Sequence, residues 1–394
     1  MSILLRKHQG EIYLTKITKI SIIGLLVAIS SAFIGTIWAV YLDSFFHNIS
    51  EVGFFSAILT LLSIAAYFFS IPLVERTKKS VIFSYSLLVI AATYFLFSLN
   101  SNLIIFIILS IVLTIVTTFR ITSFGLIIKD ASGKSKLSEN EGLMYTFLNV
   151  AWIIGPLITG YILAKSGVSP IFVLAGVFMI LGFILTKISD LKNYHIQKKV
   201  DKDLLKNFFS FFKNKDRFIL YMVGGGISFW WDLIYLFMPL YILRNNLSGM
   251  WIGYFLFAVP IPLILFEYKF SKIAGKKGFK KFFKIGYLIP AIIGLICFFI
   301  TDIFWMMGLL VLASIGMAML EPTVETYFFN ISTKKEEQRY YGPYNTKVEI
   351  FGFLGKALPS ALLLFLPFKY IFLLFSGAMF LLFLVSFKLK EKRN

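Results

Sequence analysis

Cysteine, histidine and amide side chains are scarce in this chain of 394 residues. Cys297 is the single cysteine, so the sequence has no disulfide framework and no cysteine-based metal site. The three histidines, His8, His47 and His195, fall in predicted loops or tails. The long apolar runs of the chain contain no Gln, and Asn149 is the only amide well inside one. Because the hydroxyls of a sugar or polyol need several hydrogen-bonding groups, a sugar carrier is disfavoured.

Motifs for ATP binding and for covalent chemistry are also missing. No Gly-x-x-x-x-Gly-Lys-Ser/Thr phosphate loop occurs, so ATP-driven transport by this chain is not supported. There is no nucleophile–base pairing and no metal cluster, which disfavours an intramembrane enzyme. We therefore predict a protein that is not an enzyme and that uses no cofactor.

Long apolar runs are what the chain has in abundance. Hydrophobic residues make up 58% of it and its mean hydropathy is +0.82, a composition that no soluble domain of this length carries. Each run is long enough, at 1.5 Å per residue, to cross a hydrocarbon layer of roughly 30 Å, some of them only with tilt or local thinning. The first is too long for a signal-peptide core, so we predict that it is retained. The runs are Ile17–Leu42, Val52–Leu73, Val81–Leu99, Leu103–Ile128, Gly142–Ala164, Ser169–Ile188, Arg217–Leu243, Met250–Phe270, Phe283–Ile300, Ile303–Ile331, Asn345–Leu366 and Lys369–Phe387.

The net charge of +19 is distributed in a way that indicates membrane topology and not nucleic-acid binding. With the N-terminus inside, 34 of the 39 Lys and Arg residues lie in or beside inner segments, and only three lie in outer loops. This positive-inside bias places both termini in the cytoplasm. We expect the basic residues to contact anionic lipid heads, with no nucleic-acid partner. The predicted location is the inner (plasma) membrane of the cell.

The two halves of the chain repeat each other at an offset of 200 residues. When the second half is shifted back by 200 positions, Gly24 aligns with Gly224 and Gly155 with Gly355. The same offset holds from the first run of each half to the last. Parallel six-helix repeats describe one major transporter architecture. We therefore predict an all-α polytopic membrane protein of twelve transmembrane helices in two pseudo-symmetric bundles. Its parts are an N-terminal bundle (1–188), a cytoplasmic linker with an interfacial amphipathic helix (189–216) and a C-terminal bundle (217–394).

Short motifs occur in the first half, and one of them has a copy at the corresponding place in the second half. The loop after the second run reads Leu-Val-Glu-Arg-Thr-Lys-Lys, with Glu75 followed by Arg76, and a degenerate copy occupies 273–281. The fifth run carries small residues and a proline at regular spacing, which allow close helix packing and a bend. The fourth run contains a single arginine, Arg120. The residues of the fifth-run motif are Gly142, Ala151, Gly155, Pro156, Thr159 and Gly160.

Together these motifs resemble those of the major facilitator superfamily, over essentially the whole chain. In that family the loop motif helps to latch the two halves, which assigns Glu75 and Arg76 to conformational switching. The fifth-run motif is associated with exporters and is similar to the drug:proton antiporter branch, and the resemblance links Arg120 to proton handling. For any single glycine, ordinary helix packing explains the residue equally well.

Ionisable residues inside apolar runs are where function is expected, because a charge at the centre of a span costs roughly 2.5–3.5 kcal/mol on insertion scales. Asp232 lies about 22 Å along the seventh run. Ser228, Asp232, Tyr235 and Pro239 recur on one helical face, with Trp231 adjacent. A carboxylate beside aromatic rings suits an organic cation. The alternative is an Asp that is hydrogen-bonded to a neighbouring helix for packing.

The remaining intramembrane charges are predicted to form a network. Glu321 and Lys356 lie at similar depth, so a buried ion pair between them is expected. Glu325 lies one turn below Glu321, and Glu349 lies two turns below Lys356 on the same face. We assign Glu321 to substrate or proton binding and Glu325, Glu349 and Lys356 to gating or coupling.

The sequence thus favours a secondary transporter that works by alternating access and exports a small amphipathic, cationic molecule in exchange for protons. We expect a proton gradient as the energy source, the lipid bilayer and a small-molecule substrate as partners, and a monomer. One alternative is proton-coupled uptake of an organic anion bound by Arg120 and Lys356. Another is a non-transporting receptor or scaffold of the same fold.

Overall fold

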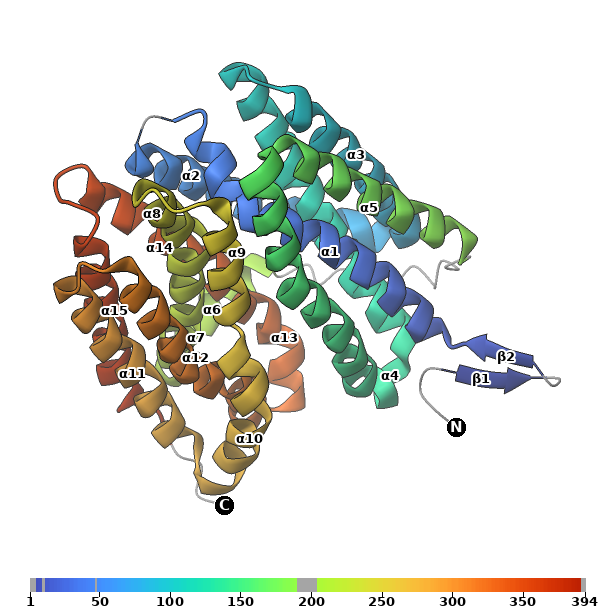
Figure 1. Ribbon diagram of the computed structural model, residues 1–394. Helices are drawn as coiled ribbons and strands as arrows, with labels where there is room; N and C mark the ends of the chain where they lie inside the picture. The colour runs from blue at the N-terminus through green and yellow to red at the C-terminus, as the bar shows by residue number, and fades with distance from the viewer. Residues whose placement is uncertain (1–4, 9–10, 47, 190–203, 391–394) are drawn as a thin grey trace. The chain divides into compact units, whose positions relative to one another are not determined.

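The computed structural model describes residues 5–8, 11–46, 48–189 and 204–390, which are almost entirely helical (Figure 1). The all-helical class is confirmed. One small element departs from it, because β1 (Leu5–His8) and β2 (Glu11–Leu14) form an antiparallel hairpin ahead of the first helix. Strands of four residues are too short to give a periodic signal, which is why the sequence did not predict them.

The described helices form two compact units. Unit 1 holds the chain up to Tyr41 and then Leu61 to the end of its last helix, and unit 2 holds Leu42–Thr60 and the second half of the chain. The domain boundaries predicted at residues 188 and 216 stay a prediction, because 190–203 lie outside the described residues. The helices that make up unit 1, wholly or in part, are α1 (Lys16–Asp43), α2 (Ile49–Arg76), α3 (Lys79–Leu99), α4 (Leu103–Ser166) and α5 (Ser169–Ile188).

Unit 2 contains the last residues of α1, the first part of α2 and every element from the linker helix onward. The first of these is the short linker helix, and the seventh predicted run is split by a π-helical turn, η1. The elements are α6 (Leu204–Phe212), α7 (Lys215–Asp232), η1 (Leu233–Phe237), α8 (Met238–Arg244), α9 (Gly249–Ala258), α10 (Ile261–Lys277), α11 (Phe279–Phe299), α12 (Ile303–Ile331), α13 (Lys334–Asn345), α14 (Lys347–Leu363) and α15 (Tyr370–Ser386).

Helices occupy all twelve predicted run positions in the described part of the chain. Ten stretches are long and apolar enough to cross a membrane, and the last two runs correspond to α14 and α15, of 17 residues each. Seventeen residues span about 26 Å, the lower end of what a bilayer core requires.

One predicted loop is wrong. The fourth and fifth runs were expected to be separate helices, but the backbone is helical throughout α4, which carries the apolar stretches Leu103–Ser132 and Thr146–Ser166. The intervening residues are polar, which favours a loop in the sequence, yet they contain no proline to break a helix. The α4 helix starts at Asn102, whose side chain accepts from two backbone N–H groups, and stops at Gly167, where φ is +74°.

Glycines set how closely the helices pack inside each unit. In unit 1 a Cβ at Gly155 would lie 2.7 Å from the Cβ of Ala32, so α4 and α1 are in backbone contact there. In unit 2 three consecutive glycines of α7 face other helices. A Cβ at Gly225 would collide with the Phe351 ring, and one at Gly226 would collide with Leu382 and Tyr287. This stretch of α7 therefore packs directly against α14, α15 and α11.

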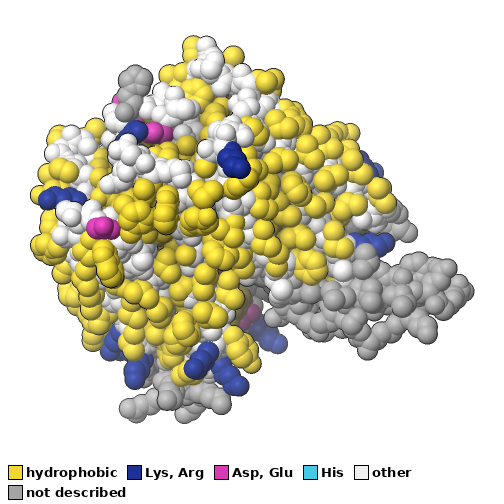
Figure 2. Space-filling model, viewed as in Figure 1, with side chains coloured by type: hydrophobic (Ala, Val, Ile, Leu, Met, Phe, Trp, Pro, Cys, Tyr) yellow, Lys and Arg dark blue, Asp and Glu magenta, His cyan; other side chains and the backbone are white. Residues whose placement is uncertain are grey.

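The outward helical faces are apolar. Figure 2 shows hydrophobic side chains over most of the visible helical surface, and large ones such as Phe69 (74% exposed) and Trp305 (70%) point outward. Apolar surface of this extent is unfavourable in water but stable against lipid tails.

Candidate functional site

A buried ion pair lies at the middle of the seventh predicted span. Nζ of Lys356, on α14, is 2.8 Å from Oδ1 of Asp232, at the end of α7, and the two side chains are 20% and 13% exposed. Lys356 also donates to the carbonyl of Gly352 in its own helix. Gly355 has no side chain, and a Cβ there would collide with Oδ2 of Asp232. The missing side chain therefore lets the carboxylate reach α14.

A second carboxyl, that of Glu321, is held by the chain neighbour of Asp232, Trp231. Nε1 of Trp231 donates to Oε1 of Glu321, on α12, at 2.7 Å. The Trp231 ring lies 5.5 Å from the Tyr235 ring, tilted by 38°. Glu321 has no basic partner within ion-pair distance in the described part of the chain. Ser228, one turn before Asp232, is only half-buried.

The predicted ion pair between Glu321 and Lys356 is wrong. Lys356 pairs with Asp232 and Glu321 with Trp231. Similar depth along two helices is not enough to predict an ion pair, because the two side chains must also point toward each other. Glu349 interacts electrostatically with both Lys356 and Asp232. We use the name acidic cluster for Asp232, Glu349 and Lys356 together with Glu321, which is linked to them through Trp231, the chain neighbour of Asp232.

The π-turn explains why the predicted helical face ends at Tyr235. The backbone N–H of Met238 donates to the carbonyl of Leu233, five residues back. Pro239 has no N–H to donate, and its ring excludes the carbonyl four residues before it, so the regular ladder cannot continue there. Pro239 is buried and lies beyond the extra residue of the turn.

Glu325 and Lys347 form a second ion pair of unit 2. Their charged atoms are 2.9 Å apart, and Nζ of Lys347 lies 3.5 Å from the centre of the Tyr344 ring. Lys347 is 4% exposed. From the sequence, Lys347 belongs with the inner positive charges, and its pairing with Glu325 was not predicted.

In unit 1, Arg120 lies in α4 and forms no ion pair with a carboxylate among the described residues. Its Nε is buried and has no hydrogen-bond partner among the described residues, and it interacts electrostatically with Tyr67 and Tyr94. The motif residues that follow it in α4 are at packing positions, with Gly155, Pro156 and Gly160 all buried. Gly142 falls in α4, in a stretch whose side chains lie outside the described ones.

The predicted latch residues lie at the end of α2. Arg76 is exposed, and the side chain of Glu75 is outside the described part of the structure. Three residues later, Lys79 forms an ion pair with Asp130 of α4 at 2.5 Å. Asp130 was not among the predicted site residues, because it falls beyond the end of the fourth run.

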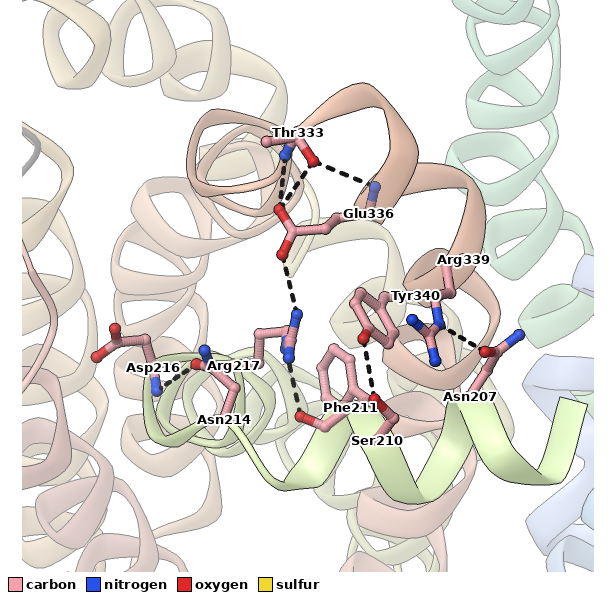
Figure 3. A network of polar contacts seen from close by, with 10 residues as sticks. All are labelled: Asn207, Ser210, Phe211, Asn214, Asp216, Arg217, Thr333, Glu336, Arg339 and Tyr340. Carbon is pink, nitrogen blue, oxygen red and sulfur yellow. Dashed lines mark hydrogen bonds and ion pairs between the residues drawn. The ribbon is translucent and has the colours of Figure 1, made fainter. Parts of the chain in front are cut away.

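The linker helix α6 is held to unit 2 by a polar network (Figure 3). Arg217, in the first turn of α7, donates to the Phe211 carbonyl and to Glu336 of α13, and its guanidinium lies 4.1 Å from the centre of the Tyr340 ring. Two further hydrogen bonds join α6 to α13, from Arg339 to Asn207 and between the hydroxyls of Ser210 and Tyr340. The apolar face of α6 includes Phe211, which is fully buried in protein. An interfacial helix that only lies on lipid would leave this residue exposed.

Comparison with known proteins agrees with this architecture. The family model described as Major Facilitator Superfamily matches residues 20–300 and 260–394. The uncharacterized MFS-type transporter MJ1560 of Methanocaldococcus jannaschii is 24% identical over 70% of this chain and 70% of its own length. The quinolone resistance protein NorA of Staphylococcus aureus is 24% identical over 82% of this chain and 83% of its own.

Solved structures show the same fold at lower sequence identity. A peptide transporter POT bound to sulfate aligns with a TM-score of 0.76 at 12% identity, covering 97% of this chain and 95% of its own. The nucleoside transporter NupG aligns with a TM-score of 0.74 at 14% identity, covering 96% and 100%.

The helices, their apolar faces and these likenesses define a multi-pass membrane protein of the transporter class. The chain belongs to the major facilitator superfamily. The resemblance inferred from its loop and helix motifs is thereby confirmed.

Proposed function

We propose that this protein is a proton-coupled exporter of small amphipathic cations that works by alternating access. The observation that carries the proposal is the acidic cluster, which has three intramembrane carboxyls, on α7, α12 and α14, and one basic side chain. An excess of acidic groups within apolar spans is costly unless protons or a cationic ligand balance them.

The aromatic residues at the cluster support a cationic substrate. Trp231 and Tyr235 stand one turn apart with tilted rings, and the Trp231 indole N–H is already bonded to Glu321. The ring faces remain suited to a cation, which is attracted to the negative face of an aromatic system within about 6 Å of its centre. Glu321 supplies the nearby negative charge.

The name of one relative supports export. A relative carries the name quinolone resistance protein, and a membrane carrier confers resistance most directly by moving a compound out of the cell. The peptide and nucleoside transporters are too distant in sequence to bear on the substrate.

Proton coupling follows from the same carboxyls. A carboxyl that alternately meets water on the two sides of the membrane can release a proton on one side and take one up on the other. In this proposal Asp232 exchanges the proton and Arg120 assists in unit 1. Glu75 and Arg76 switch the conformation, and Glu325 and Glu349 act in gating. Both termini are cytoplasmic, and the protein works as a monomer in the plasma membrane.

Uptake of an organic anion is the second candidate. It uses Arg120 and Lys356 as ligands for the substrate carboxylate, and of these two the Lys356 ammonium is engaged by Asp232. A non-transporting receptor is the third, and a stable co-purifying partner together with the absence of flux would favour it.

Flux measurements in everted vesicles test the proposal. Everted vesicles that contain the protein and have an acidic interior should accumulate a lipophilic cation. Accumulation should stop when the pH gradient is collapsed. Accumulation of organic anions in right-side-out vesicles, with no movement of cations in either preparation, would overturn it.

A further inference from the structure

Lys356 is the only basic residue of the acidic cluster, and its position is unusual for a structural lysine. Its ammonium uses one hydrogen bond on Asp232 and one on the carbonyl of Gly352, and the side chain remains 20% exposed. A lysine that served only to neutralise Asp232 would be better covered. Oδ2 of Asp232 is buried and has no hydrogen-bond partner in the described part of the chain. The carboxylate therefore keeps an unused acceptor oxygen beside a lysine side chain that is only partly covered.

The chemistry of the ammonium matches that of the proposed substrate. A primary ammonium on a flexible four-carbon stem is a compact point charge, and it leaves a carboxylate more readily than a guanidinium does, because the latter binds through two parallel hydrogen bonds. An organic cation that enters the cluster meets the same carboxylate that Lys356 occupies.

We infer that Lys356 is a tethered competitor of the cationic substrate, which occupies Asp232 in the empty transporter and is displaced when substrate binds. The inference rests on the proposed function and adds a specificity-determining residue to it. When the Lys356 ammonium is displaced, Glu349 can accept it. Glu349 lies on the same helix, two turns before Lys356, and interacts with it electrostatically. Lys356 would thus move from Asp232 toward Glu349 when substrate arrives, and no buried charge would be left alone.

Competition of this kind has a predictable size. If the competitor occupies the site in nine of ten molecules, the apparent dissociation constant is about ten times the intrinsic one. Removing the ammonium while keeping the apolar stem should therefore tighten cation binding by about tenfold. Strengthening its bond to Asp232 should weaken cation binding.

Equilibrium binding to the purified full-length protein tests this without a proton gradient. The probe is tetraphenylphosphonium, and tetraphenylborate is an anion of the same shape. Lys356→Met should bind the phosphonium about tenfold more tightly than the native protein and should not gain affinity for the borate. Lys356→Arg should bind the phosphonium several-fold more weakly. Adding Asp232→Asn to Lys356→Met should abolish the gain.

Each other outcome counts against the inference. Equal phosphonium affinity in the native, Met and Arg proteins would overturn the competitor role while leaving cation specificity intact. Weaker phosphonium binding by Lys356→Met would show that the lysine organises the site. Binding of the borate alone, lost in Lys356→Met, would overturn both the inference and the proposed cationic substrate. Thermal unfolding of each variant verifies that it is folded.

Discussion

At the scale of single residues, the hydrogen bond from Trp231 to Glu321 is the sharpest test of the cluster. Trp231→Phe keeps an aromatic ring but removes the donor that satisfies a partly buried carboxyl. A buried acceptor left without its partner costs about 1–3 kcal/mol. We expect a lower thermal unfolding midpoint in detergent and weaker cation binding.

The matched control is Trp305→Phe, at the start of α12, where the native ring is 70% exposed. Substitution at such a position should change the free energy of unfolding by no more than about 0.5 kcal/mol. If the two variants unfolded at the same temperature and bound the probe equally, the indole would have no role in holding Glu321.

The sequence located the acidic residues of the site but not their partners. Asp232, Glu321 and Lys356 were recognised because charges are rare in apolar spans. Depth along a helix is known from the sequence, but the direction in which a side chain points across the bundle is not. The carboxyl predicted to pair with Lys356, that of Glu321, was therefore the wrong one. Lys347 was missed because a lysine near a span end follows the inside-positive bias, whatever its role.

At the scale of elements, the glycines of α7 make a prediction about packing. A Cβ at Gly225 would collide with the Phe351 ring, whereas one at Gly308 of α12 meets nothing within 4 Å. Gly225→Ala should destabilise the protein by about 1–3 kcal/mol through overpacking. Gly308→Ala should be neutral or stabilising by up to about 1 kcal/mol, since it only restricts the backbone. Thermal unfolding of the two alanine variants measures the difference, and equal midpoints would contradict the close approach of α14 to α7.

The network around α6 predicts a pH dependence. Glu336 accepts from the backbone N–H and the hydroxyl of Thr333 and pairs with Arg217, and the first of these contacts is the largest cause of its lowered pKa. A carboxyl whose pKa is lower in the folded protein stabilises it above the ordinary pKa of about 4.3. That contribution is lost as the pH falls through the lowered value.

Glu336→Gln tests this dependence. The variant should unfold at a lower temperature than the native protein at pH 7, and the difference should shrink as the pH is lowered below about 4. Glu337→Gln, next in the chain and with no described side-chain hydrogen bond, is the control and should show little change at either pH. A Glu336→Gln difference that does not depend on pH would contradict the role of the carboxylate.

Element positions were predicted better than element shapes. Apolar run length located every spanning helix, because the bilayer dictates it. The π-turn in the seventh span and the continuity of α4 were missed, since both depend on local backbone bonding. Pro239 was a usable signal for the π-turn. The absence of proline between the fourth and fifth runs was a usable signal for the continuity of α4.

At the scale of the whole molecule, the proposed alternating access of two six-helix bundles predicts that the start of α2, in the first predicted bundle, separates from α14, in the second, during the cycle. In the structure the Ser50 hydroxyl donates to the Ser360 carbonyl at 2.6 Å, and a Cβ at Gly53 would lie 3.2 Å from the Cβ of Ser360. That spacing is close to the roughly 3.5–4.5 Å of a disulfide. The double variant Gly53→Cys with Ser360→Cys should cross-link on oxidation and lose flux, and reduction should restore it. The native Cys297 is buried and should not interfere. A cross-linked protein with full flux would refute this movement.

The central claim is that the Asp232 carboxyl couples proton movement to export, and one flux experiment tests it most directly. Asp232→Asn alone removes one partner of a largely buried ion pair and thereby risks destabilising the protein, so the double variant Asp232→Asn with Lys356→Met removes both charges. In proteoliposomes with an imposed pH gradient, Lys356→Met should retain gradient-driven cation transport. The double variant, equally folded, should lose it. Undiminished gradient-driven transport by the double variant would contradict the account.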